Sequence, residues 1–483
     1  MQQGNKCLCL KNYFLLLSLL LVLLSGCGSS SPSVTKAKAK PKPTPTAIPD
    51  NGERFYLNTA TSLAQYRTLD GHQLWSWNDD SQANNTTGGF SDLTIGNEMA
   101  YMNVPTSGNY HIVAFDINTG KKVWQTPFNY ATTFILDGKV LYVGSGTNVY
   151  GVNTSNGQAT WEVPISSNEN INFMFLQGTT LYVSNKYAIF AFDTRTHSQI
   201  WTYSMNQLNV FDEINNLWVD GNSLVVATAQ NISGFDAHTG KFLWIADMTV
   251  VGYTSDTQAH TVQVVTSAFR DTPNNGKAGL LTIQTNNGGG TVSWNAQFSV
   301  NPDSIEQIKF TNDSVFIAQN NVIDSQIVVL SLKDGHKEWT ADAAPPVNGV
   351  RTTSSSETVA VLRVTSNVVY AVMNDGFIYT FDVTSGKLLW NKGLLAVDVL
   401  PVESADQTST ELYTFGKAAT ADANQTSAPN QGYVAKLNPQ TGNVIWQSNA
   451  DIAVYFPMQV NATYVPSSAG TVTSQDEPTP THE

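Results

Sequence analysis

The sequence predicts an all-β protein, a β-propeller made of four-stranded antiparallel sheets. Three observations predict it. Tryptophans recur about every 46 residues, and each follows a turn motif flanked by alternating apolar and polar residues. In addition, no segment after the first 50 residues shows a sustained 3.6-residue apolar period, so helices are expected to be minor. Four-stranded sheets that repeat at such a spacing are typical of a propeller.

The N-terminal segment, residues 1–26, is predicted to be a signal for export. Lys6 and Lys11 give it a positive start, and a nearly continuous run of Leu, Val and Phe follows from Tyr13 to Leu24. This apolar run has the length of a signal core and is too short to span a bilayer. Signal segments are removed, so these residues are set apart from the fold.

The apolar run ends in Leu-Ser-Gly-Cys, which resembles the lipobox of bacterial lipoproteins. The resemblance implies that Cys27 gains a diacylglyceryl thioether and that two or three acyl chains anchor the protein to a membrane. The alternative is an ordinary secretory signal with an incidental cysteine. Residues 27–50, rich in Ser, Lys and Pro, favour an extended, semi-rigid stalk. We therefore expect a protein of the bacterial cell envelope that faces outside the cytoplasm.

The remaining chain divides into a propeller over residues 51–473 and a disordered tail over residues 474–483. Cys7 and Cys9 leave with the signal, so the propeller has no cysteine for a disulfide, a thiolate metal site or a nucleophile. Without the first 50 residues, 19 basic residues stand against 37 acidic ones, a net charge near −18. Such a charge argues against binding to nucleic acid.

Nine of the eleven tryptophans set the phase of the repeat. Glycine stands four residues before eight of them, and His197 takes that place in the repeat of Trp201. Asp or Asn stands eight residues before seven of them, whereas Arg67 and Ser331 depart from this rule. Asp or Asn closes a turn on its own backbone and Gly supplies positive φ, so each unit reads as strand, tight turn, strand. The nine residues are Trp75, Trp124, Trp161, Trp201, Trp244, Trp294, Trp339, Trp390 and Trp446.

A second hairpin precedes most of these units, for example over residues 134–143, so two hairpins make one four-stranded sheet. The residues before Trp75 and after Trp446 together supply one blade, closed by N- and C-terminal strands. A literal count of the motif then gives nine blades. Trp218 lies outside the register of the motif and is expected in the core.

The unit Ala/Gly-x-Asp-x-x-Thr-Gly-x-x-x-Trp resembles the PQQ-like (quinoprotein-type) repeat, and the resemblance covers roughly residues 52–473. It implies a propeller usually of eight blades, in which each Trp docks against the motif of the neighbouring blade. Eight is therefore the expected number, with the unit from Asn286 to Trp294 as the weakest repeat. The propeller lipoprotein of the Bam outer-membrane assembly complex shares this type of repeat and a lipid anchor.

The resemblance implies a non-catalytic scaffold in the cell envelope that binds a protein or an envelope polymer without a cofactor, and we expect the protein to be a monomer. The alternative is a small-ligand sensor, or a PQQ- and calcium-dependent dehydrogenase-like protein that uses the central channel. Quinoprotein dehydrogenases commonly carry a disulfide between adjacent cysteines, which this propeller cannot form. The stalk and Gly28 also suit a bacterium without an outer membrane, in which the Bam role could not exist.

The histidines give no metal motif, and no catalytic, metal-binding or cofactor-binding residue is predicted. Four of them belong to the turns of the repeat and are expected to be solvated. His111 and His260 are isolated in the sequence. The four turn histidines are His72, His197, His238 and His336.

Overall fold

The computed structural model describes residues 52–466 except 60, 80–92, 107–108, 166, 211, 270–277, 287–288, 299–303, 321–324, 345–357, 405, 418–430 and 454–460. The chain divides into two units, Met1–Pro49 and Asp50–Glu483, and all described residues belong to the second. The predicted signal, Cys27, the stalk and the tail over residues 474–483 lie outside the described residues. In the described part, no helix is long and apolar enough to cross a membrane.

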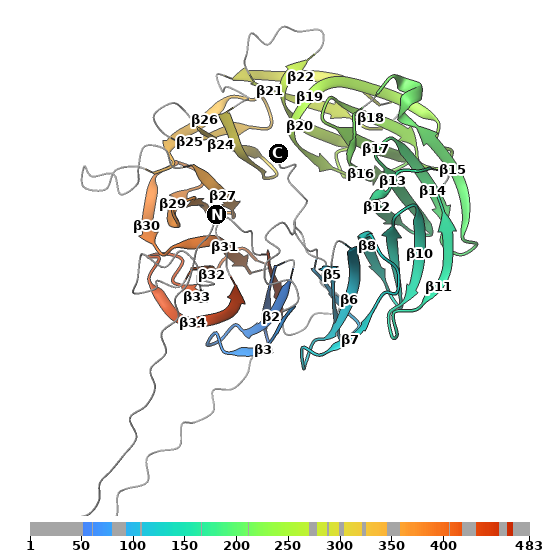
Figure 1. Ribbon diagram of the computed structural model, residues 1–483. Coiled ribbons are helices and arrows are strands. Elements are labelled where there is room, and N and C mark those ends of the chain that lie inside the picture. The colour runs from blue at the N-terminus through green and yellow to red at the C-terminus, as the bar shows by residue number, and fades with distance from the viewer. Residues whose placement is uncertain are drawn as a thin grey trace, which may run out of the picture. The chain divides into compact units, whose positions relative to one another are not determined.

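The second unit is built of β-strands, as expected, and its one described helix is the short 3₁₀ helix Met205–Leu208. Figure 1 shows the strands arranged as the blades of a propeller, in chain order around a centre. The strands of the first half are β1 (Arg54–Thr59), β2 (Ser62–Arg67), β3 (Gln73–Asn78), β4 (Leu93–Gly96), β5 (Met99–Thr106), β6 (Asn109–Asp116), β7 (Lys122–Gln125), β8 (Ala131–Asp137), β9 (Val140–Ser145), β10 (Asn148–Asn153), β11 (Ala159–Pro164), β12 (Ile171–Gln177), β13 (Thr180–Asn185), β14 (Ala188–Asp193), β15 (Ser198–Ser204), β16 (Ile214–Asp220), β17 (Ser223–Thr228) and β18 (Asn231–Asp236).

The strands of the second half continue the same pattern, and the first strand of each blade lies toward the centre while the last lies at the rim (Figure 1). They are β19 (Phe242–Asp256), β20 (Thr261–Phe269), β21 (Ala278–Gln284), β22 (Val292–Phe298), β23 (Ile305–Phe310), β24 (Ser314–Asn320), β25 (Ser325–Ser331), β26 (Lys337–Asp342), β27 (Val359–Val364), β28 (Val368–Met373), β29 (Phe377–Asp382), β30 (Leu388–Gly393), β31 (Ala396–Glu403), β32 (Thr410–Lys417), β33 (Gln431–Leu437), β34 (Val444–Ala453) and β35 (Asn461–Val465).

These strands form eight antiparallel sheets, seven with four strands and one with seven. The seven-stranded sheet runs from β16 to β22 because β19 is continuous: its first part pairs with β18 and its second part, from Met248, pairs with β20. The expected eight-bladed propeller is thus confirmed as eight sheets. The nine motif repeats fit into them because the seven-stranded sheet contains two.

The propeller is closed by pairing between the two ends of the unit, as predicted. The C-terminal strand β35 pairs with β1 in antiparallel register, from Arg54 opposite Val465 to Asn58 opposite Asn461. In that blade β35 is the first strand and β1, β2 and β3 follow it outward. The C-terminal part therefore contributes one strand to the described blade.

The core lies between neighbouring blades. One cluster joins Tyr101 and Ile112 of the β4–β7 sheet to Leu141 and Val143 of the β8–β11 sheet, and all four are buried. Strands in a propeller have both faces covered, which explains the long apolar runs of β9, β13 and β17. Trp218 is buried in such a cluster and stacks on Tyr253 with ring centroids 5.2 Å apart, so its predicted core position is confirmed.

Candidate functional site

The repeat tryptophans join each blade to the next. Trp75 lies over Gly120 of the following blade, where an added Cβ would come within 2.5 Å of the ring. Its Nε1 donates a hydrogen bond to the Ile117 carbonyl at 2.8 Å. The docking implied by the resemblance is therefore confirmed for seven of the tryptophans. The pairs are Trp75 on Gly120, Trp124 on Gly157, Trp201 on Gly240, Trp244 on Gly290, Trp339 on Gly386, Trp390 on Gly442 and Trp446 on Gly71.

The turn that receives each ring is held by its Asp or Asn. The Asp116 carboxylate accepts hydrogen bonds from the backbone N–H of Asn118 and Thr119 and from the Thr119 hydroxyl. The N–H of Gly120 donates to the Asp116 carbonyl at 2.8 Å. The hydrogen bond from the Thr119 hydroxyl is the main reason that the pKa of the Asp116 carboxyl lies below its usual 3.8. These aspartates are structural, because their oxygens are engaged by the turn.

The repeats that depart from the motif keep the same turn by other means. His197 adopts the left-handed conformation of the missing glycine, with φ of 57°, and its ring stacks on Trp161 with centroids 4.5 Å apart. Arg67, in place of Asp, binds the Asp70 carboxylate inside its turn. The side chain of Trp294 lies outside the described part.

In the repeat before Trp294, the turn starts at a different residue from the one that the sequence predicted. Gln284, and not Asn286, stands where the other repeats have Asp: the N–H of Gly290 donates to the Gln284 carbonyl at 2.8 Å. In the other turns the equivalent bond spans four residues, and here it spans six. The turn between Gln284 and Gly290 is thus two residues longer than the others.

This longer turn brings together residues that sequence reasoning left apart. His260, predicted to be isolated, makes a 2.7 Å contact from Nδ1 to the Asp220 carboxylate. The Thr285 hydroxyl donates to the other oxygen of Asp220, whose side chain is 2% exposed. Ser223 donates to the Thr285 carbonyl at 2.8 Å. The group links the two repeats of the seven-stranded sheet, and its carboxylate is flanked by donors, which is a structural arrangement.

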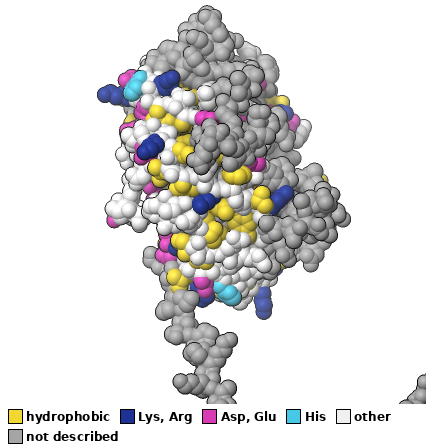
Figure 2. All heavy atoms as spheres, turned by 90° about the vertical axis from the view of Figure 1, so that its left-hand side faces the viewer, with side chains coloured by type: hydrophobic (Ala, Val, Ile, Leu, Met, Phe, Trp, Pro, Cys, Tyr) yellow, Lys and Arg dark blue, Asp and Glu magenta, His cyan; other side chains and the backbone are white. Residues whose placement is uncertain are grey.

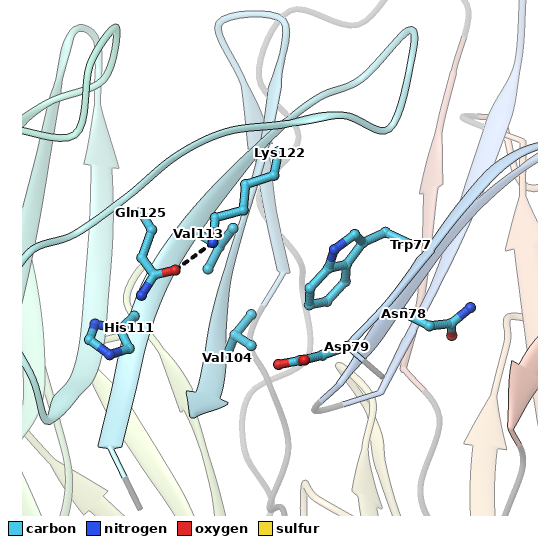
Figure 3. Close-up of a pocket in the computed structure, with 8 residues that line it drawn as sticks. All are labelled: Trp77, Asn78, Asp79, Val104, His111, Val113, Lys122 and Gln125. Carbon is cyan, nitrogen blue, oxygen red and sulfur yellow. Dashed lines mark hydrogen bonds between the residues drawn. The ribbon is translucent and has the colours of Figure 1, made fainter. Parts of the chain in front are cut away.

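A cavity of about 230 Å³ opens between the blade of β3 and the blade of β5, β6 and β7. The first blade contributes Trp77, Asn78 and Asp79, and Figure 3 shows the Trp77 ring and the Asp79 carboxylate directed into the cavity while Asn78 turns away. The facing wall is formed by Val104, His111, Val113, Lys122 and Gln125. The sequence prediction named none of these residues as a site.

The lining has an apolar part and a polar part. Trp77 packs on Phe115 with ring centroids 4.8 Å apart and faces the buried side chains of Val104 and Val113, so this part of the lining is apolar. On the facing wall Lys122 donates to the Gln125 side-chain oxygen at 2.5 Å.

The His111 ring is oriented by its partner. Nδ1 of His111 lies 3.2 Å from the Thr126 carbonyl, which can only accept, so Nδ1 carries the proton. In the neutral ring, Nε2 is then an acceptor.

The remaining turn histidines are exposed, as expected for His72, His238 and His336. His336 contacts the Asp334 carboxylate of its own turn at 2.5 Å. Within the described ranges no cluster of three His, Cys, Asp or Glu side chains could hold a metal ion.

The rim of the propeller carries apolar side chains at one recurrent position, the residue directly before the repeat Trp. In each of these repeats the residue is the extra one of a β-bulge between the last two strands of the blade, as Val123 is between β6 and β7. Figure 2 views the side that carries β26 and β30 and shows hydrophobic side chains gathered there between charged ones. In the final two blades Leu389 is 47% exposed and Ile445 is 57% exposed. The exposed members are Leu74, Val123, Ile200, Leu243, Leu389 and Ile445.

Comparison with known proteins agrees with this fold. The profile of a family described as "Outer membrane protein assembly factor BamB" matches residues 33–246, 229–395 and 281–453. No curated protein sequence matches the chain.

Solved structures show similar folds. The "Crystal structure of the eukaryotic initiation factor" is 11% identical, covers 86% of this chain and 98% of that chain, and has a TM-score of 0.51. "The crystal structure of BamB from Moraxella catarrhalis" is 12% identical, covers 74% of this chain and 89% of that chain, and has a TM-score of 0.38. Because the family profile spans most of the propeller and the docked tryptophans agree with its repeat, the chain belongs to the PQQ-like propeller family described as outer membrane protein assembly factor BamB.

Proposed function

We propose that the protein is a non-catalytic scaffold of the cell envelope, held to a membrane through Cys27, that binds another protein with the rim of its propeller. Membership of a family described as an assembly factor supports a binding role. The observation that carries the proposal is the set of exposed apolar side chains on the outer strands of the last two blades.

We call these side chains the rim patch: Leu389 of β30 together with Val444 and Ile445 of β34, which are between 43% and 57% exposed. Lys392 of β30 donates to the side chain of Asn443, the residue just before β34, so the outer strands of the two blades approach each other here. Exposed apolar side chains that cluster on a folded protein favour association with a partner.

The outer strands also offer backbone groups. In the described part, β30 pairs only with β29 and β34 pairs only with β33, which leaves one edge of each strand open. An open edge with apolar side chains suits a partner that adds an extended strand.

The test is crosslinking of the full-length protein in membranes, followed by purification. We expect a defined partner that is retained by the wild type and lost from a Leu389→Lys/Ile445→Lys variant. Val123→Lys is the matched control, because Val123 is exposed at the same position of β7 in another blade. A partner that survives the double substitution, or is lost equally from the control, would contradict the proposal.

The anchor has its own test. Cys27→Ser should move the protein from the membrane fraction to the soluble fraction, because the thioether that carries the acyl chains cannot form. If this variant remains with membranes, the proposal of a lipid anchor at Cys27 is wrong. The proposal that the rim patch binds a partner is tested separately by the crosslinking experiment.

A further inference from the structure

We propose that the cavity between β3 and β7 binds one ring of a neutral saccharide, with Trp77 as the platform and Asp79, His111 and Gln125 as polar partners. The inference does not depend on the scaffold role, because the cavity and the rim patch involve different blades.

The size and position of the cavity favour a single ring with a chain that continues outside. Its volume of about 230 Å³ is below the range of roughly 300–1,000 Å³ that drug-sized ligands occupy. Asn78 and Lys122 at its edge are exposed, so the cavity opens to solvent between the outer strands of two blades. A polymer bound by one unit could therefore leave the cavity along the rim.

The apolar part of the lining suits the carbon-bound hydrogens of a pyranose ring. The Trp77 ring is directed into the cavity, opposite the wall that Val104 and Val113 supply (Figure 3). The face of an aromatic ring is negative and attracts the slightly positive C–H groups of a sugar. The Trp77 ring also packs on Phe115 of β6, which is buried, and this contact restricts the motion of the platform.

The polar part of the lining supplies both donors and acceptors, as hydroxyl groups require. The Asp79 carboxylate accepts, the amide nitrogen of Gln125 donates, and His111 presents Nε2 to the cavity side because its Nδ1 faces the Thr126 carbonyl. Lys122 and Asp79 bring one charge of each sign. A lining with one charge of each sign attracts neither an anion such as phosphate nor a metal cation as strongly as a lining of one sign would, and so it favours a neutral ligand.

A second blade provides a matched control for the packing of the platform. Tyr203 stands two residues after Trp201, as Trp77 stands two residues after Trp75, and it packs on Phe235 with centroids 4.8 Å apart. Trp77 and Phe115 show the same spacing, 4.8 Å. Substitution of Tyr203 therefore removes an equivalent aromatic contact without touching the cavity.

The experiment is calorimetric titration of the full-length protein with three neutral oligosaccharides, cellotetraose, maltotetraose and chitotetraose, and with free leucine as a zwitterionic probe. We expect saturable binding of at least one oligosaccharide and none of leucine. Trp77→Ala should weaken that binding by about tenfold or more, since loss of an aromatic contact and its buried area exceeds 1.4 kcal/mol. Asp79→Asn should weaken it less, and Tyr203→Ala should leave it unchanged.

Three outcomes would overturn the inference: no oligosaccharide binds at millimolar concentration, leucine binds and the sugars do not, or Trp77→Ala binds as well as Tyr203→Ala. Unfolding curves of both variants show whether each is folded. If Trp77→Ala fails to fold, Asp79→Asn and Gln125→Ala replace it, and unchanged binding by both counts against the site.

Discussion

Two interfaces between repeats achieve the same contact with different hydrogen bonds. At the interface of the β4–β7 and β8–β11 sheets, Trp124 covers Gly157 and its Nε1 donates to the Thr154 carbonyl at 2.7 Å. Between the two repeats of the seven-stranded sheet, Trp244 covers Gly290, but its buried Nε1 has no acceptor among the described residues.

At the second interface, other groups make the hydrogen bonds between the two repeats. The Thr285 carbonyl occupies the place of the Thr154 carbonyl, and it accepts from Ser223. Asp220 then holds His260 and Thr285 from the next repeat. The contact of an indole ring with a glycine is common to both interfaces, whereas the hydrogen bond is replaceable. We therefore expect the ring-on-glycine contact to contribute more to the free energy of unfolding than the indole hydrogen bond does, and substitutions can test this ranking.

The largest effect is expected for Gly120→Ala. The new Cβ would meet the Trp75 ring and would stand at φ of 67°, a conformation that side chains disfavour. Together the clash and the strain should lower the free energy of unfolding by about 3 kcal/mol, measured in urea. Gly138→Ala is the control, with φ of 54° and nothing within 4 Å of the new Cβ, and should lose only about 1 kcal/mol. Equal losses would show that strain alone, and not the ring contact, matters.

The second effect concerns the polar group of the seven-stranded sheet. Asp220→Ala removes the acceptor of both His260 and Thr285 at a buried position and should lower the free energy of unfolding by about 2 kcal/mol. Asp137→Ala, at the equivalent Asp-Gly turn between β8 and β9, is exposed and should change stability little. Similar losses in the two variants would mean that the turn, and not the link between repeats, is what Asp220 supports.

A smaller difference is expected between two conservative substitutions of tryptophan. Trp124→Phe leaves the Thr154 carbonyl without the indole donor, whereas Trp244→Phe removes an N–H that has no acceptor in the described part of the chain. Trp124→Phe should therefore be less stable than Trp244→Phe by about 1 kcal/mol in chemical unfolding. The reverse order would mean that the interface of the seven-stranded sheet depends on the indole ring more strongly than the other.

The smallest effect is the pH dependence of the turns. Hydrogen bonds from Thr119, Thr239 and Ser385 hold the pKa values of Asp116, Asp236 and Asp382 below 3.8. Because the folded pKa is lowered, the contribution is complete above about pH 4 to 5 and is lost as the pH falls through the folded pKa.

A triple substitution of these residues to Asn keeps the turn, as Asn153 and Asn438 do in their own repeats. The stability advantage of the wild type over this variant, measured by thermal unfolding, should shrink between pH 6 and pH 3. An advantage that stays constant over this interval would contradict the assignment of the shifts to these three turns.

The sequence predicted the propeller, the closure by its two ends and the docked tryptophans, because these depend on short motifs repeated at a fixed spacing. His197 could be noted only as an exception, since its left-handed conformation and its stacking on Trp161 depend on the neighbouring blade. Gln284 was missed because an insertion of two residues moved the turn while Asn286 kept the expected distance from Trp294. Spacing alone cannot separate these two alignments.

The cavity was missed for a different reason. Its walls come from two blades, and the contact between Trp77 and Phe115 depends on how those blades pack. One signal was available: Trp77 lies two residues after Trp75 and therefore on the same side of the strand, toward the next blade. The Asp220–His260 contact left no such signal, because 40 residues separate its partners.

The pairing of β35 with β1 has a consequence for biosynthesis. Strand β35 lies at residues 461–465 and is the last of the described strands, so it emerges from the ribosome after all the strands that precede it. Until then the blade of β1, β2 and β3 lacks its first strand, and the nascent chain holds an open arc with apolar faces at both ends. Joining segments some 400 residues apart also costs loop-closure entropy, which makes ring closure a late and slow step. A chain whose translation stops just before Asn461 would therefore be a substrate for chaperones or proteases, although almost all of its blades have been made.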